Sequence, residues 1–502
     1  MASILYLKTE GKQSSKESIC LSNAYMLDET FLRICPDIKK RATFLEVVSE
    51  ISNSLTANFR AEILVDFNQE KTLCRELQEL FKKLNEIWMN FEDSRGLILT
   101  LADKKGSDSS VFTSASCLNV SAIALGKLLS VLHDISEKLV FLNLHSDGLC
   151  MLQKRLEPFH NSDPYYNLVA LCEQYSSFSC EYSSFDLLAS LNDCAEIAEV
   201  VFLKQRKKCS VDLPGKNANL KKEELCGKMH FNLFKRHVSA HNNNVAVPMI
   251  SKYHSNVFVS QAIDALTNAF VAIINTIKSE FCNICTELDF YCVAQSYCEF
   301  LSGIEVPLTF PQISDMDGTC FWGLFDLYLL SSECSKSNVV PNDFLLDNSI
   351  NGILIRGDNG SGKTVFLRSI ATAQLLAMAG LPIPAKQAAL SVRRIYSLFA
   401  SSEKVLNESF ENAGRFEEEV KSLAAILEFA DDHSLLILNE IFQTTSYDEG
   451  AEGLFHILNY LSYRGVQWVV VTHLSPLFDM FKNENVKIME IDKATRKVKS
   501  IN

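Results

Sequence analysis

The sequence lacks any apolar run long enough to cross a membrane as a helix. Such a span needs about 18 consecutive apolar residues, and no run among these 502 residues approaches that length. The first twenty residues, Met1 to Cys20, also lack the basic start and the apolar stretch of a secretory signal. We therefore expect an intracellular protein with no membrane partner.

The chain also has fewer basic than acidic residues. The chain has 48 Lys and Arg against 61 Asp and Glu, a net charge of −13. This excludes a globally basic footprint for nucleic acid but leaves room for a local patch. The segment from Lys204 to Arg236 holds ten basic residues against three acids, and it offers either phosphate contacts or a solvated hinge between helices. Its basic residues are Lys204, Arg206, Lys207, Lys208, Lys216, Lys221, Lys222, Lys228, Lys235 and Arg236.

The cysteines lack a repeated spacing. Sixteen are spread from Cys20 to Cys334, a distribution unlike the disulfide framework of a short secreted domain. Cys282 and Cys285 form one C-x-x-C without a second pair, so a zinc site is incomplete. We expect reduced thiols that are mostly buried, with these two on a helix.

Glycine and proline are scarce in the first 300 residues, which contain seven and five of them, against twelve and six in the remaining 202. Long helices are therefore expected first and many turns afterwards. One stretch without either residue, Met249 to Ser302, would reach roughly 80 Å as one helix, or it is two helices. One helix face is indicated by the apolar residues Ile263, Leu266, Phe270, Ile273 and Ile277.

A glycine-rich loop divides the second part. It follows an apolar run of strand length, 351–355, and precedes a helical pattern over 365–379, the order that a phosphate-binding P-loop requires. The loop reads G-x-x-x-x-G-K-T, so we expect its backbone N–H groups and Lys363 to hold phosphates and Thr364 to ligate Mg²⁺. The expected nucleotide-binding residues are Gly357, Asp358, Asn359, Gly360, Ser361, Gly362, Lys363 and Thr364.

Two further apolar runs end in residues suited to hydrolysis. The run 435–438 reads as a buried parallel strand and ends in Asn439 and Glu440. Glu440 is positioned to act as general base, and Asn439 can hold Mg²⁺ through a water but brings no charge. The run 469–471 leads through Thr472 to His473, which we expect to sense the γ-phosphate. The neutral Asn439 predicts a slow or conditional ATPase.

Taken together, these motifs resemble the MutS family of DNA mismatch-repair ATPases. The family's loop reads G-P-N-x-x-G-K-[ST], and Asp358 stands here in place of its proline. The family's further motifs have counterparts here in the same order. Its G-x-x-V-P-A corresponds to 380–385, D-R-I-[FY] to 394–396, S-T-F-x-x-E to 414–419, D-E-I-G-R-G-T-S to 439–446, and T-H to Thr472-His473.

The resemblance implies a mixed fold. A long α-helical core and lever region over residues 1–305 would precede an α/β P-loop NTPase domain of ABC type over 306–502. It also implies ATP and Mg²⁺ as cofactors, a homodimer or heterodimer through the ATPase domain, and double-stranded or branched DNA as partner. In a bacterium, such a cytoplasmic protein would associate with the nucleoid.

Two departures from the family pattern bear on function. Gly414 occupies the place of a serine that reaches the partner's γ-phosphate, and its side chain cannot do so. Mismatch sensors begin with a domain carrying Phe-x-Glu, for which we expect no counterpart, since Phe44-Leu45-Glu46 lies within a helical pattern.

The leading prediction is a Mg-dependent ATPase whose ATP state controls DNA binding, in DNA repair or recombination. The first alternative is a nucleotide-binding switch with little or no hydrolysis that acts on a protein partner. An ABC ATPase of another class would carry an L-S-G-G-Q-type signature, which is lacking. A P-loop kinase or transferase is the remaining alternative, and the residues from Asn439 to His473 favour hydrolysis over it.

Overall fold

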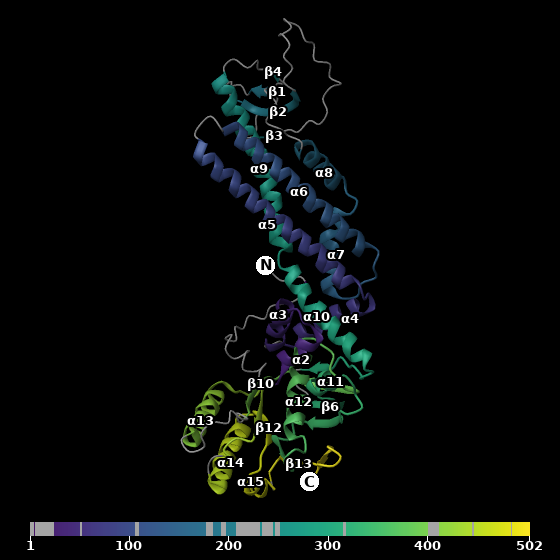
Figure 1. The fold of residues 1–502 in the computed structure, drawn as a ribbon, viewed down its shortest axis with the longest axis vertical. Coiled ribbons are helices and arrows are strands. Elements are labelled where there is room, and N and C mark those ends of the chain that lie inside the picture. The colour runs from purple at the N-terminus through teal and green to yellow at the C-terminus, as the bar shows by residue number, and fades with distance from the viewer. Residues whose placement is uncertain are drawn as a thin grey trace. The chain divides into compact units, whose positions relative to one another are not determined.

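The computed structural model describes most of the chain. The described residues are 5, 25–50, 53–105, 110–176, 184–191, 197–206, 231–232, 244–245, 252–314, 318–399, 411–443, 446–482 and 484–501. They divide into two compact units (Figure 1). One unit comprises 1–78, 143–152 and 283–502, and the other comprises 79–142 and 153–282.

Helices dominate the part of the chain before residue 305, as the scarcity of glycine and proline predicts. Their bounds are α2 Leu27–Ile34, α3 Ile38–Ser49, α4 Ser54–Gln69, α5 Leu73–Lys105, α6 Ser110–Val140, α7 Asp147–Leu156, the 3₁₀ helix η2 Glu157–Phe159, α8 Asp163–Ser176, α9 Lys252–Phe281 and α10 Ile284–Gly303. The predicted boundary at residue 305 falls just after α10, and it stays a prediction.

Within the stretch 249–302, which lacks glycine and proline, the structure has two helices, α9 and α10, rather than one. The chain turns at Cys282 and Asn283. Of the predicted apolar face of α9, Ile263, Leu266, Phe270 and Ile277 are buried and Ile273 is partly so. This face packs within the second unit, where α9 and α8 both contact α6.

Within α6, Ser114–Val140 passes the length and composition test for a membrane span. Over its most apolar window 56% of the residues are buried inside the structure, as in the core helix of a folded bundle. The finding therefore gives only weak support for a membrane segment.

Strands also occur within the mainly helical region, where the scarcity of glycine and proline had indicated helices. A four-stranded antiparallel sheet has the order β3-β2-β1-β4. Its run Glu199-Val200-Val201-Phe202 is rich in branched and aromatic side chains, which favour strands over helices. The bounds are β1 Ser184–Leu191, β2 Ile197–Arg206, β3 Phe231–Asn232 and β4 Asn244–Val245.

The remainder alternates strands and helices, as predicted, and builds two sheets. One has the order β5-β9-β6-β7. The larger has the order β10-β11-β12-β8-β13-β14, in which the first five strands, β10, β11, β12, β8 and β13, run parallel. The bounds are β5 Gln312–Ser314, β6 Thr319–Leu324, α11 Leu327–Glu333, β7 Asn342–Leu346, β8 Gly352–Arg356, α12 Lys363–Met378, β9 Gln387–Ser391, β10 Arg394–Phe399, α13 Glu411–Phe429, β11 Ser434–Asn439, α14 Tyr447–Tyr463, β12 Gln467–Val471, α15 Ser475–Met480, β13 Val486–Ile491 and β14 Val498–Ser500.

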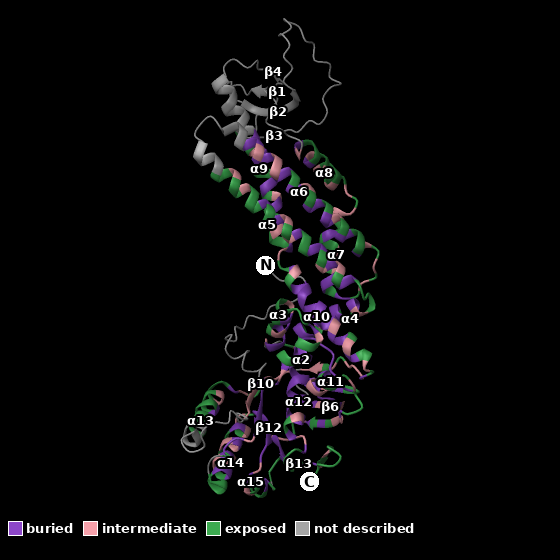
Figure 2. Ribbon diagram, viewed as in Figure 1, coloured by how far each residue is buried: buried purple, intermediate pink, exposed green. Residues whose placement is uncertain are grey.

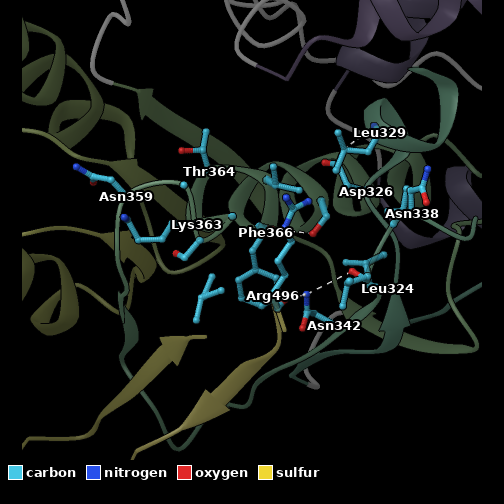
Figure 3. A pocket seen from close by; sticks show the side chains of 18 of the residues that line it. Leu324, Asp326, Leu329, Asn338, Asn342, Asn359, Lys363, Thr364, Phe366 and Arg496 are labelled. Atoms are coloured by element: carbon cyan, nitrogen blue, oxygen red, sulfur yellow. Dashed lines mark hydrogen bonds between the residues drawn. The ribbon is translucent and has the colours of Figure 1, made fainter. Parts of the chain in front are cut away.

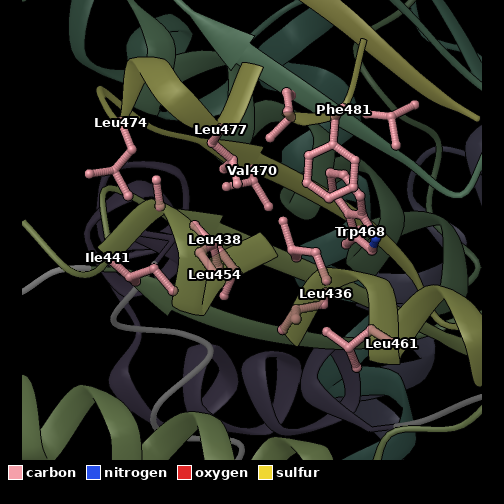
Figure 4. Packing of buried hydrophobic residues seen from close by; sticks show 14 of the residues in the cluster. Leu436, Leu438, Ile441, Leu454, Leu461, Trp468, Val470, Leu474, Leu477 and Phe481 are labelled. Atoms are coloured by element: carbon pink, nitrogen blue, oxygen red, sulfur yellow. The ribbon is translucent and has the colours of Figure 1, made fainter. Parts of the chain in front are cut away.

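Both faces of the larger sheet are covered, which explains why its central strands β11 and β12 are largely apolar and buried throughout (Figure 2). Alternate residues point to opposite faces. Leu436, Leu438 and Val470 join Leu454 of α14 and Leu477 of α15 in one buried cluster (Figure 4). Helix α12 contacts β11 and β12. The sheet is thus packed between helices on both faces.

The packing of one indole requires a glycine. A Cβ atom added to Gly352 would lie 2.2 Å from the ring of Trp468 on the neighbouring strand β12. Trp468 is fully buried, and its ring lies against Phe481, with centroids 5.5 Å apart. Gly352 therefore lets β8 run directly past the indole, just before the chain enters the phosphate loop.

Candidate functional site

The phosphate loop joins β8 to α12, as predicted. Gly360 and Gly362 have φ angles of 77° and 102°, which a residue without a Cβ atom adopts readily. Lys363 begins α12, and its Nζ donates to the carbonyl oxygens of Gly357 and Asp358 at 2.8 and 3.1 Å. The ammonium group is thus folded over a loop at a helix N-terminus, where the helix dipole favours an anion.

The interior of the loop is shaped by small residues. A Cβ atom on Gly357 would lie 2.8 Å from the Ser361 Oγ atom and 2.9 Å from the Ile491 carbonyl oxygen. Ser361 is fully buried, and its hydroxyl has no hydrogen-bond partner in the part of the chain that the structure describes. A buried hydroxyl of this kind costs free energy unless it finds a partner. The loop therefore fits a phosphate group, whose oxygens accept hydrogen bonds.

Neighbouring parallel strands bring the other predicted site residues to the same edge. β11, β12 and β8 lie side by side, with Asn439 opposite Val471 and Val471 opposite Ile355. The Glu440 Oε1 atom lies 3.6 Å from the Lys363 Nζ and 2.9 Å from the His473 Nε2. The general base, the phosphate lysine and the sensor histidine expected from the sequence therefore form one cluster.

The two expected metal ligands also lie together. The Thr364 hydroxyl is 3.4 Å from the Asn439 Oδ1 atom, and Thr364 is exposed. Hydroxyl and amide oxygens are hard donors of the kind that Mg²⁺ accepts, together with waters and substrate phosphates. This donor set fits Mg²⁺, but it lacks the carboxylate charge that an aspartate at position 439 would add.

The backbone after β11 is held in an unusual conformation. Glu440 and Phe442 have φ angles of 55° and 62°, a region that side chains with a Cβ atom rarely adopt. The Glu440 N–H donates to the Val471 carbonyl at 2.9 Å, and the Phe442 N–H donates to the Glu419 carboxylate at 2.8 Å. Glu419, buried on α13, therefore fixes the turn that presents Glu440. Sequence reasoning assigned Glu419 no role, although the family segment contains it.

A cavity of about 450 Å³ opens beside the phosphate loop. In Figure 3 the side chains of Asn359, Lys363 and Thr364 lie on one side of it and those of Leu324 and Asn342 on the other. Its further lining comes from Asn338, Val339, Val340, Phe366, Glu440, Ile491 and Arg496, among others. This second wall was not predicted, because its residues form no motif with the loop in the sequence.

A buried ion pair supports the same wall. Arg368 of α12 donates to Asp326 through Nε at 2.9 Å and through a terminal nitrogen at 2.7 Å. Asp326 also caps α11 by accepting from the Leu329 N–H at 2.8 Å. The Arg368 guanidinium lies 4.6 Å from the centre of the Tyr328 ring. The helix that begins with Lys363 is therefore tied to α11.

The predicted DNA contacts are not placed by the structure. Lys204 and Arg206 lie on β2, where only the backbone is described, and Lys207, Lys208, Lys221 and Lys222 lie outside the described residues. Gly414 lies on α13. Phe44 is fully buried in α3, with its ring 5.4 Å from that of Phe290, so it is a core residue and not a base wedge.

Comparison with known proteins agrees with the motifs. Residues 353–501 match the model of MutS domain V. An endonuclease MutS2 of Thermus thermophilus is 36% identical over 141 residues, which are 28% of this chain and 18% of the relative. An endonuclease MutS2 of Clostridium botulinum is 28% identical over 222 residues, 44% of this chain and 26% of the relative.

The matches thus span about a fifth to a quarter of the curated relatives. They include the phosphate loop, Glu440 and His473 in the region that matches the family model. The predicted resemblance to the MutS family is confirmed by these matches, in which residues 353–501 are similar to domain V of that family.

Proposed function

We propose that the chain is a Mg-dependent ATP hydrolase of MutS type whose ATP state controls binding to DNA in repair or recombination. The observation that carries this proposal is the cluster of Lys363, Glu440 and His473, with Glu440 Oε1 3.6 Å from the lysine and 2.9 Å from the histidine. A lysine at the start of a helix binds phosphate, and a carboxylate beside it is placed to activate water.

Each residue has one task in the proposed reaction. The N–H groups of the loop and the Lys363 ammonium hold the β- and γ-phosphates and offset their charge. Glu440 takes a proton from a water molecule, whose oxygen bonds to the γ-phosphorus as the bond to the β,γ-bridging oxygen breaks. The products are ADP and phosphate, with the proton on Glu440. His473, in contact with that carboxylate, detects the loss of the γ-phosphate.

The metal would be held by Thr364 directly and by Asn439 through a water. Bound Mg²⁺ supplies positive charge to the phosphate oxygens. Because Asn439 is neutral, this site offers less negative charge to the cation than one with an aspartate. We therefore expect the dependence on Mg²⁺ concentration to be shallow and to saturate late.

The DNA partner and the dimer rest on the family resemblance and on charge. The basic residues from Lys204 to Lys222 would contact phosphates of double-stranded or branched DNA, which gives affinity without base readout. Two chains would associate through the ATPase domain. An intracellular setting belongs to the same proposal.

Steady-state ATP hydrolysis by the purified chain tests the proposal. It is measured without DNA and with homoduplex, mismatched and branched DNA. We expect Glu440→Gln to bind ATP but to lose at least about a hundredfold in turnover, and Lys363→Ala to lose binding. Glu452→Gln, which removes an exposed carboxylate from α14, is the matched control and should turn over normally. Turnover that persists in Glu440→Gln would remove the proposed base.

A nucleotide switch with little hydrolysis is the second candidate, and Asn439 is the observation that favours it. The carbonyl oxygen of Asn439 faces the Thr364 hydroxyl, where a charged ligand would hold the metal more firmly. In this case ATP binds tightly, turnover stays negligible with every DNA, and a protein partner reads the bound state. Restoring the charge with Asn439→Asp distinguishes the two, because a site limited only by this ligand gains turnover.

A further inference from the structure

The wall of the cavity opposite the phosphate loop is largely apolar. Leu324, Val339, Val340 and Ile491 line it, and they come from β6, the connection before β7, and β13. Such a surface suits a flat aromatic ring better than a charged phosphate. If the phosphates of a nucleotide lie on the loop, as the proposed function requires, the base lies against this wall.

One cation stands beside this apolar wall. Arg496 lines the cavity from the turn between β13 and β14, and its exposed guanidinium has no ion pair with the described part of the chain. Figure 3 shows Arg496 near Asn342. The neighbouring side chains of Asn342 and Asn338 are engaged in hydrogen bonds. Asn342 accepts from the Val498 N–H at 3.0 Å and donates to the Arg496 carbonyl at 3.1 Å, and Asn338 donates to Glu333 at 3.2 Å.

The turn that carries Arg496 is fixed to the wall. Besides the two Asn342 contacts, the Lys497 ammonium donates to the Pro341 carbonyl, and the Arg496 N–H donates to the Asp492 carbonyl at 2.7 Å. The Asn342 contact uses the backbone of Arg496 and leaves its side chain free to move. The backbone of Arg496 is therefore held at the lining of the cavity, while its guanidinium can adjust to a ligand there.

We propose that Arg496 holds the nucleotide by stacking its guanidinium on the face of the base, as a specificity element for nucleotides over free polyphosphate. A guanidinium is planar, always charged and weakly hydrated, so it stacks well on aromatic faces. Stacking uses the π-face, which every base has, so Arg496 supports ATP and GTP alike. This inference rests on the proposed nucleotide site and adds a residue to it.

Equilibrium binding of ATP, GTP and inorganic tripolyphosphate to the full chain tests the inference. The variants are Arg496→Ala, Arg496→Lys and the control Lys493→Ala, which removes an exposed charge from the same turn without touching the cavity. We expect Arg496→Ala to weaken ATP and GTP by a similar factor, roughly 3- to 30-fold, and to leave tripolyphosphate unchanged. Arg496→Lys recovers part of the loss, and Lys493→Ala binds as the wild type does.

The contrary outcomes are separable. If Arg496→Ala also weakens tripolyphosphate binding, Arg496 contacts phosphate. If it weakens ATP and GTP unequally, Arg496 hydrogen-bonds to the edge of the base. Each of these results overturns the stacking role. Unchanged binding in Arg496→Ala overturns any role. Failure of the proposed site itself looks different, because the wild type would then bind neither ATP nor tripolyphosphate and Lys363→Ala would change nothing.

Discussion

The buried pair of Asp326 and Arg368 provides a sharp test of how α12 is held. Its atoms meet at 2.7 and 2.9 Å, and the side chains are only 3% and 10% exposed. Asp326→Asn keeps the shape and one acceptor oxygen, but it removes the charge that offsets the Arg368 guanidinium. We expect the unit that contains α11 and α12 to lose about 3 to 5 kcal/mol, because breaking one partner of a buried pair leaves an uncompensated charge.

An exposed pair with the same spacing is the matched control. Arg75 and Glu299 also meet at 2.7 Å, but their side chains are 54% and 48% exposed. Water screens this pair, so Glu299→Gln should cost about 0 to 1 kcal/mol. Because the shortest N···O distance is equal in the two pairs, the difference between the variants reports the burial of Asp326 together with its second bond to Arg368 and its cap of α11.

Hydrogen exchange in urea, read by mass spectrometry on peptides from α11 and α12, gives the opening free energy of this region. For Glu299→Gln the peptides are those of α10. Equal losses in the two variants, or a loss below about 1 kcal/mol in Asp326→Asn, would refute the reasoning. A double variant with Arg368→Met should recover much of the loss, because it removes the stranded charge.

Two further predictions concern the larger sheet and the loop before β8. Gly352→Ala places a Cβ atom 2.2 Å from the Trp468 ring and should lower the free energy of unfolding by roughly 1 to 3 kcal/mol. The control Gly453→Ala, on α14 with open space around it, should leave the stability unchanged. Equal thermal melting temperatures of the two variants would contradict this prediction. Hydrogen bonds from Ser349 lower the pKa of Asp347 below its ordinary value of 3.8. The stability that this lowered pKa gives is present above pH 3.8 and is lost as pH falls through the folded-state pKa. Ser349→Ala should raise the pKa of Asp347 in a carboxyl NMR titration. An unchanged pKa would show that the Ser349 hydroxyl does not stabilise the carboxylate.

The phosphate loop was predictable because all of its parts are consecutive. Its glycines, Lys363 and Thr364 lie between the end of β8 and the first turn of α12, so eight residues in order carry the geometry of the loop. The strands of the larger sheet were predictable for a related reason: a strand covered on both faces must be apolar throughout, as 435–438 and 469–471 are.

The way in which the helical region divides into separate helices was harder to predict from the sequence. The chain breaks between α9 and α10 at Cys282 and Asn283, and neither residue is a glycine or proline, so the sequence left one helix and two equally open. The sheet of β1 to β4 was missed because the absence of glycine and proline does not by itself select helix over strand. The branched residues of β2 were the available signal.

Contacts between segments far apart in the sequence could not be predicted from the motifs, for a physical reason. Parallel strands place their carboxyl ends at one edge, so Glu440 and His473 could be expected near Lys363 once their strands were recognised. Glu419 and Arg496 reach the same region by other routes, one through a helix that caps a turn and the other through a hairpin tied to Asn342. Neither route leaves a spacing in the sequence, because each depends on how a neighbouring element packs. The motifs therefore identify the groups proposed to act on phosphate, whereas Glu419 and Arg496 follow only from the folded structure.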